Sequence, residues 1–134
     1  MTPAEYLDLV KERLLDDPVV AWFQIRRERA TPIDAHLRVR AILASGDRLE
    51  FSEYAERTQQ GNLHVSVYSY HWEDTAGKLI RRWDNTPHFP DLPGFPHHIH
   101  DGRTDDILPG TPIDIFAVLE YINLAQHPRS ILRK

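Results

Sequence analysis

The sequence contains no cysteine, so it offers neither disulfides nor thiolate ligands for a metal. It also lacks a glycine-rich phosphate loop, an H-E-x-x-H motif and a G-x-S-x-G motif, and it gives no sign of a nucleotide cofactor. No apolar run approaches the ~20 residues that a membrane span needs. The first five residues lack the basic and apolar regions of a signal peptide. We therefore expect a cytoplasmic protein with no membrane partner.

The chain has 134 residues, a common size for one domain, and we interpret residues 1–134 as a single domain. Its formal net charge is −4, so the chain as a whole is not a cationic nucleic-acid binder. A local basic patch would still allow contact with RNA. Five of the eight histidines fall between residues 71 and 100, so we expect the chemistry of the protein in that stretch.

The chain begins with a predicted helix. Thr2 and Glu5 have the spacing of a capping box, and Pro3 occupies the first helical position, where its missing N–H costs nothing. Apolar residues then follow at spacings of three and four, which places them on one helix face: Tyr6, Leu7, Val10 and Leu14. The segment Asp16-Asp17-Pro18 ends this helix.

A second helix is predicted near the other end of the chain. Thr111-Pro112-Ile113-Asp114 resembles a capped helix start, and Pro128 ends the helix. One helix face is formed by Ile115, Val118, Leu119 and Ile122, and a second by Phe116 and Tyr121. A helix that is apolar on two sides is either deeply buried or shared with a partner, which in a homodimer would be a second copy of the chain.

Strands are predicted between the two helices. Apolar residues alternate with polar ones or cluster with β-branched and aromatic residues in the segments 19–29, 36–43, 48–55, 63–72 and 78–83. Ser45-Gly46-Asp47 and Thr75-Ala76-Gly77 are typical of tight turns between such strands. The short connections predict an antiparallel meander of four to five strands, with the C-terminal helix packed on it, in the α+β class.

Residues 85–112 contain six of the ten prolines, which predicts an extended Pro/His-rich loop rather than a helix or a central strand. If the segment is extended, His98 and His100 project to one side and His97 to the other. Two neighbouring imidazoles, near a third from His71 or His88, can act as a general acid and base, since histidine titrates near neutral pH.

The same imidazoles suit a second interpretation. Neutral imidazole is a common nitrogen ligand of zinc, so His97, His98 and His100 are an alternative set of ligands for a divalent metal. A third interpretation is that the histidines only hydrogen-bond the irregular backbone of the loop. Asp84 or Asp101 could orient an imidazole, and Arg81 or Arg82 could stabilise developing negative charge.

The strands beside the loop carry further candidates. By alternation, Tyr68, Tyr70 and Trp72 lie on one face of their strand and His71 on the other. Exposed rings and arginines suit contacts to bases and phosphates, which makes these four residues and Asp84 the predicted substrate-binding set. Cross-strand packing of the aromatic side chains is the alternative.

Several of these residues together resemble the TumE family of toxins from bacterial and archaeal toxin–antitoxin modules. The resemblance lies in Tyr68-Ser-Tyr-His-Trp72, Gly77-Lys-Leu-Ile-Arg-Arg-Trp-Asp-Asn85, Pro87-His88 and Phe95-Pro-His-His-Ile-His-Asp-Gly102. It implies a toxin whose partner is an antitoxin, typically a helix-turn-helix DNA-binding protein. It does not supply a reaction.

Our leading hypothesis is therefore a toxin that cleaves RNA by histidine acid–base chemistry without a cofactor. The predicted catalytic residues are His88, His98, His100, Arg81 and Arg82. Two alternatives remain open. One is a hydrolase or binding protein that depends on a divalent metal such as zinc, and the other is a non-enzymatic binding module that a partner protein neutralises.

Overall fold

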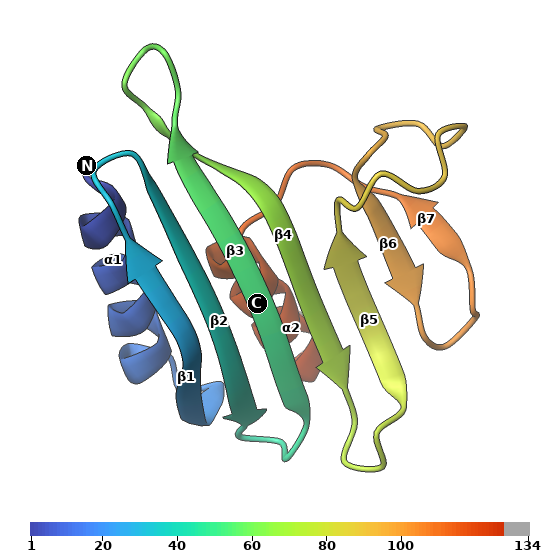
Figure 1. Cartoon of the computed structure of the whole chain (residues 1–134). Coiled ribbons are helices and arrows are strands. Elements are labelled where there is room, and N and C mark those ends of the chain that lie inside the picture. Colours follow the sequence, from blue (N-terminus) through green and yellow to red (C-terminus); the bar gives the residue numbers. More distant parts are fainter. Residues whose placement is uncertain (128–134) are drawn as a thin grey trace, which may run out of the picture.

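A seven-stranded antiparallel sheet, in the order β1-β2-β3-β4-β5-β6-β7, forms the centre of the protein. The computed structural model describes residues 1–127. The elements, in chain order, are α1 Pro3–Asp16, β1 Val20–Ala30, β2 Asp34–Leu43, β3 Arg48–Arg57, β4 Leu63–Glu73, β5 Leu79–Asp84, β6 His98–Asp101, β7 Ile107–Pro109 and α2 Ile115–Gln126. Both helices lie on the same side of the sheet, and we call the opposite side the open face (Figure 1). Among the described residues, no helix is long and apolar enough to cross a membrane.

Helix α1 follows the sequence prediction closely. The Thr2 hydroxyl accepts a hydrogen bond from the Glu5 N–H at 3.0 Å, and the Glu5 carboxylate accepts one from the Thr2 N–H at 2.8 Å. The predicted capping box is therefore confirmed. Leu7, Val10 and Leu14 are buried, as their spacing indicated, and they hold α1 against the sheet.

The predicted meander is confirmed, because every strand pairs antiparallel with the strand before it. The predicted number of four to five strands is wrong, because residues 85–112 are not only a loop. They contain β6 and β7, which extend the sheet beyond β5. The prolines misled the prediction: the stretch His98–Asp101 itself contains none, and Pro109 lies at the end of the last strand, where a missing N–H breaks no ladder.

Close backbone contacts seat these two added strands. Gly94 has φ +81°, and a Cβ there would lie 2.3 Å from the Gly110 carbonyl oxygen. A Cβ on Gly110 would in turn lie 2.9 Å from the backbone N of His98. Glycine is therefore required where the loop passes the segment that leaves β7. Such tight contact fixes the start of β6, and with it the position of His98.

Helix α2 covers the middle of the sheet on the same side as α1. Its N-cap, Asp114, accepts a hydrogen bond from the Ala117 N–H at 3.0 Å. The predicted inner face is buried, and Tyr121 of the second face packs edge-on against Trp83, with ring centroids 5.3 Å apart. Leu124 is exposed. The helix ends at Gln126, and Pro128, which was predicted to end it, lies outside the described residues.

A buried carboxylate ties the two helices to the sheet. Glu53 on β3 accepts hydrogen bonds from the hydroxyls of Tyr6 at 2.5 Å and Tyr70 at 2.6 Å, and from the Ile115 N–H at 2.8 Å. Burial raises the pKa of Glu53. One side chain thus joins α1, β3, β4 and the start of α2.

We predict that Glu53→Ala lowers the free energy of unfolding by about 2–4 kcal/mol, because the hydroxyls of buried Tyr70 and part-buried Tyr6 and the Ile115 N–H lose their acceptor. Urea denaturation measures the change. Glu56→Ala, three positions along the same strand and exposed, is the control and should stay within about 0.5 kcal/mol of the wild type. Equal stability of the two variants would contradict the role assigned to Glu53.

Candidate functional site

Strand pairing arranges polar side chains in two parallel rows across the open face. Directly paired positions form the first row, the Asp84 row, which consists of Arg38, Ser52, Ser69, Asp84 and His98. The second, the Arg82 row, consists of Arg40, Glu50, His71, Arg82 and His100. Each row crosses β2 to β6 without interruption, because residues that pair directly project to the same face.

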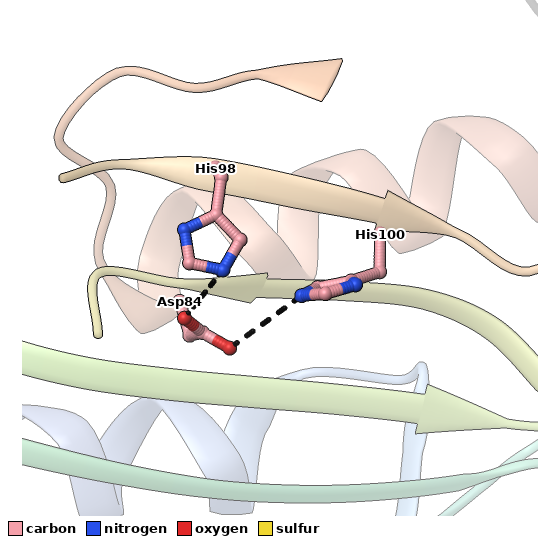
Figure 2. Close-up of side chains that lie close together, drawn as sticks. All are labelled: Asp84, His98 and His100. Atoms are coloured by element: carbon pink, nitrogen blue, oxygen red, sulfur yellow. Dashed lines mark ion pairs between the residues drawn. The ribbon is translucent and has the colours of Figure 1, made fainter. Parts of the chain in front are cut away.

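Asp84 joins the two rows at their β6 end. Its Oδ1 lies 2.9 Å from His98 Nε2, and its Oδ2 lies 4.0 Å from His100 Nε2. Figure 2 shows the carboxylate between the two imidazoles, with one oxygen toward each ring. Arg82 Nε donates a hydrogen bond to Oδ2 at 2.9 Å. We call Asp84, His98 and His100, with Arg82, the Asp84 centre.

His98 faces Asp84 in an unusual way. Its Nδ1 lies 3.0 Å from the Pro96 carbonyl oxygen, which can only accept, so Nδ1 carries a hydrogen. Nε2 is buried and, although 2.9 Å from Asp84 Oδ1, it makes no well-directed hydrogen bond to any described residue. The two atoms are therefore in contact without a directed hydrogen bond, and a metal cation bound by both would supply the missing interaction.

The loop between β5 and β6 covers part of the Asp84 centre. The Phe89 ring packs edge-on against His98 and His100, with centroids 5.2 and 6.1 Å away. Asp84 and His98 are buried as a result, whereas the side chain of His100 remains 27% exposed. His100 is thus the imidazole of the pair that a substrate can reach.

Electrostatics keeps the accessible imidazoles neutral. Burial is the largest influence on His100 and lowers its pKa, while the negative charge of Asp84 raises it. His88, on the covering loop, is close enough for its charge to lower the pKa of His100 further. Burial and the Arg82 charge likewise lower the pKa of His71, whose Nδ1 lies 3.3 Å from Arg82 Nη1.

The structure separates the two candidate arginines. Arg82 lies on the open face in the Asp84 centre. Arg81 lies on the helix side, with its guanidinium carbon 4.7 Å from the centroid of Tyr121 and 5.5 Å from that of Trp83. The prediction that either arginine could serve the same centre is therefore wrong for Arg81, because neighbouring residues of a strand point to opposite faces.

The aromatic residues also lie on the helix side. Tyr70 is fully buried, and Tyr68 and Trp72 are 4% exposed. The prediction that these rings are exposed for stacking on bases is wrong, because both helices pack on the face that carries them. Their substrate-binding role therefore lacks an accessible surface, while His71 and Asp84, from the same predicted set, lie on the open face.

The predicted metal ligands do not all converge. His97 faces away from its neighbour and its Nδ1 lies 2.8 Å from the Tyr68 hydroxyl. The group with metal-ligand spacing is Asp84, His98 and His100, whose ligand atoms all lie within 4.8 Å of one another. A carboxylate and two imidazoles are a suitable donor set for zinc or another divalent ion.

Sequence reasoning missed the members of the rows on β2, β3 and β4, notably Arg38, Ser52 and Ser69. Their alternation with apolar residues was visible, but only the strand register shows that they align with Asp84. It named Asp84 as a group that could orient an imidazole, but it missed that this carboxylate lies between His98 and His100.

Comparison with known proteins gives a family match. A protein-family model with the description Toxin TumE matches residues 10–124, a span that includes every strand and the whole Asp84 centre. No curated protein and no solved structure matches the chain.

We predict that Asp84→Asn lowers the pKa of His100 below its wild-type value, because it removes the one negative charge that raises it. NMR titration of the histidine side chains, recorded with EDTA present, measures the shift. Asp106→Asn, which changes the same charge on an exposed residue, is the control. An unchanged or raised pKa of His100 in the Asp84 variant would show that the two groups do not interact as the geometry implies.

Proposed function

Because this chain belongs to the TumE toxin family, we propose that it acts as a toxin by cleaving RNA at the Asp84 centre. Membership of the family supports the toxin role and implies an antitoxin partner. The observation that carries the proposed chemistry is the placement of an accessible imidazole, His100, beside a carboxylate and the Arg82 guanidinium. This combination provides a base, an orienting group and a cation for a phosphate.

In the proposed reaction, the His100 imidazole accepts the proton of a ribose 2′-hydroxyl through the ring nitrogen that does not face Asp84, while the 2′-oxygen bonds to the adjacent phosphorus. The bond from this phosphorus to the 5′-oxygen breaks, and His88 donates a proton to the leaving oxygen. The products carry a 2′,3′-cyclic phosphate and a free 5′-hydroxyl. Arg82 offsets the negative charge that gathers on the phosphate oxygens.

The lowered pKa of His100 supports its role as the base, because the imidazole is then neutral near pH 7 and ready to accept a proton. Buried His98 has a different role in this scheme. It packs against Asp84, with Nε2 2.9 Å from Oδ1, so it acts as a positioning residue. Its own Nδ1 contact with the Pro96 carbonyl fixes the ring.

We further propose that the antitoxin is of the helix-turn-helix type, as the family resemblance implies. The outward side of α2 offers apolar side chains to a partner, since Tyr121 is 37% and Leu124 55% exposed. A binding module without catalysis would be neutralised by a partner protein on this same surface. Such a module would still bind its target when the Asp84 centre is mutated, whereas the proposed enzyme would lose its activity. Mutation of the centre therefore distinguishes the two.

We predict that the purified protein cleaves total RNA in the presence of EDTA, and that His100→Ala slows cleavage by about 10²-fold or more because the general base is lost. Gel analysis and mass spectrometry of the fragment ends measure the rate and identify the cyclic phosphate. His64→Ala, which changes an exposed histidine on β4 outside the centre, is the matched control. Cleavage at the same rate by the His100 and His64 variants would refute the acid–base mechanism.

One observation favours a metal-dependent hydrolase as the second candidate: the buried Nε2 of His98 faces a carboxylate oxygen without a directed hydrogen bond. Asp84, His98 and His100 would hold the ion, which would supply a Lewis acid beside the phosphate. In the metal-free mechanism EDTA leaves the rate unchanged. The metal-dependent mechanism would replace the metal-free one if three results were found together. One divalent ion per chain would stay bound through gel filtration, His98→Ala would lose it, and activity would require it.

A further inference from the structure

A pocket of about 360 Å³ lies on the open face next to the Asp84 centre. Its lining includes two arginines, two serines, a histidine and a glutamate: Arg38, Arg82, Ser52, Ser69, His71 and Glu50. Arg82 belongs to both the pocket and the centre, because it bonds Asp84 through Nε and contacts His71 through Nη1. A ligand that fills the pocket therefore touches the same guanidinium that serves the reacting phosphate.

The two rows continue from this pocket across the sheet. From His98 and His100 on β6 to Arg38 and Arg40 on β2 there are four strand-to-strand steps, about 19 Å in all. This path is longer than a single nucleotide. Its side chains remain accessible along the way, with 53% of the Arg38 side chain and 35% of the Arg82 side chain exposed.

The charge along the path favours an anion. The rows carry three arginines, Arg38, Arg40 and Arg82, against the two carboxylates Glu50 and Asp84. Glu50 is shared by two of the arginines, at 3.2 Å from Arg38 and 3.8 Å from Arg40. One cationic charge is left over, on a protein whose net charge is −4. Guanidinium groups with free donors suit phosphate oxygens.

The chemistry of the rows suits a sugar–phosphate backbone rather than bases. Neither row contains a phenylalanine, tyrosine or tryptophan, the large rings on which bases most often stack. The hydroxyls of Ser52 and Ser69 and the imidazole of His71 offer short polar groups next to the arginines. Such groups can hydrogen-bond the ribose 2′-hydroxyl, the feature by which a protein distinguishes RNA from DNA.

We propose that the open-face pocket is a binding subsite for single-stranded RNA, holding the phosphate and ribose next to the linkage that the Asp84 centre cleaves. This inference rests on the proposed function, because cleavage at the Asp84 centre fixes where the RNA begins on the sheet. From there the RNA runs along the two rows from β6 toward β2. Recognition is through the backbone, so it is largely independent of base sequence. Arg38 is the phosphate contact at the far wall of the pocket.

The test measures binding without cleavage. The full-length His100→Ala variant is titrated into a fluorescein-labelled single-stranded RNA of mixed sequence, and anisotropy is followed at several salt concentrations. Adding Arg38→Gln should weaken binding about tenfold, and the slope of log affinity against log salt should become shallower by about 0.7, the value for one lost phosphate contact on a single strand. The matching DNA should bind more weakly than the RNA.

Arg103→Gln is the matched control, because Arg103 is an exposed arginine that lines a separate pocket with Tyr121 on the helix side. It should leave affinity and salt slope unchanged. Ser69→Asp is a second variant that places a carboxylate in the pocket, and it should weaken binding even if Arg38→Gln fails to fold. Thermal melting identifies folded variants.

Any of three results would overturn the subsite. The first is that Arg38→Gln and Ser69→Asp both bind RNA as tightly as Arg103→Gln does. The second is that the His100→Ala parent does not bind RNA, and the third is that RNA and DNA bind with equal affinity. The proposed function is judged separately by cleavage. Cleavage by the wild type with unaltered binding by the pocket variants refutes the subsite and leaves the reaction standing. Weakened binding without any cleavage supports the subsite and refutes the reaction.

Discussion

The contact of the Asp84 carboxylate with cationic and titratable groups on both sides is the constraint on which the open face depends. A charge that is 4% exposed has to be offset by neighbours, or its burial would cost several kcal/mol. Arg82 supplies one neighbour from the same strand and His98 another from β6. The site therefore forms only when β6 pairs with β5, because this pairing places His98 beside Asp84. An irregular loop in place of β6 would not fix that position.

The two deeply buried carboxylates of the sheet illustrate different uses of the same group. Glu53 lies on the helix side and accepts hydrogen bonds from two tyrosine hydroxyls and a backbone N–H. All three donors lie on the helix side, so its role is to hold the helices. Asp84 lies on the open face, and its partners are a guanidinium and two imidazoles, one of which solvent reaches. Its surroundings are suited to chemistry rather than to anchorage.

Local features were predictable from the sequence, whereas features set by register were not. The Thr2 capping box and the projection of His98 and His100 to one side follow from spacing alone, and both hold. Alternation correctly separated Tyr70 from His71, but a period of two does not say which face the helices cover. That is why rings expected on the surface are in the core. Proline content concealed β6, because the prolines flank a short strand instead of interrupting it.

The two edges of the sheet also affect how the protein meets other chains. At one edge, β7 is only three residues long and ends in Pro109, which cannot donate to a neighbouring strand. At the other, β1 is long, but its register shifts twice and its second half carries exposed Arg26, Arg27 and Arg29. Bulges and clustered charge discourage edge-to-edge pairing. The protein thus resists joining its sheet to that of another molecule, and its two faces are left as the surfaces on which a partner can settle.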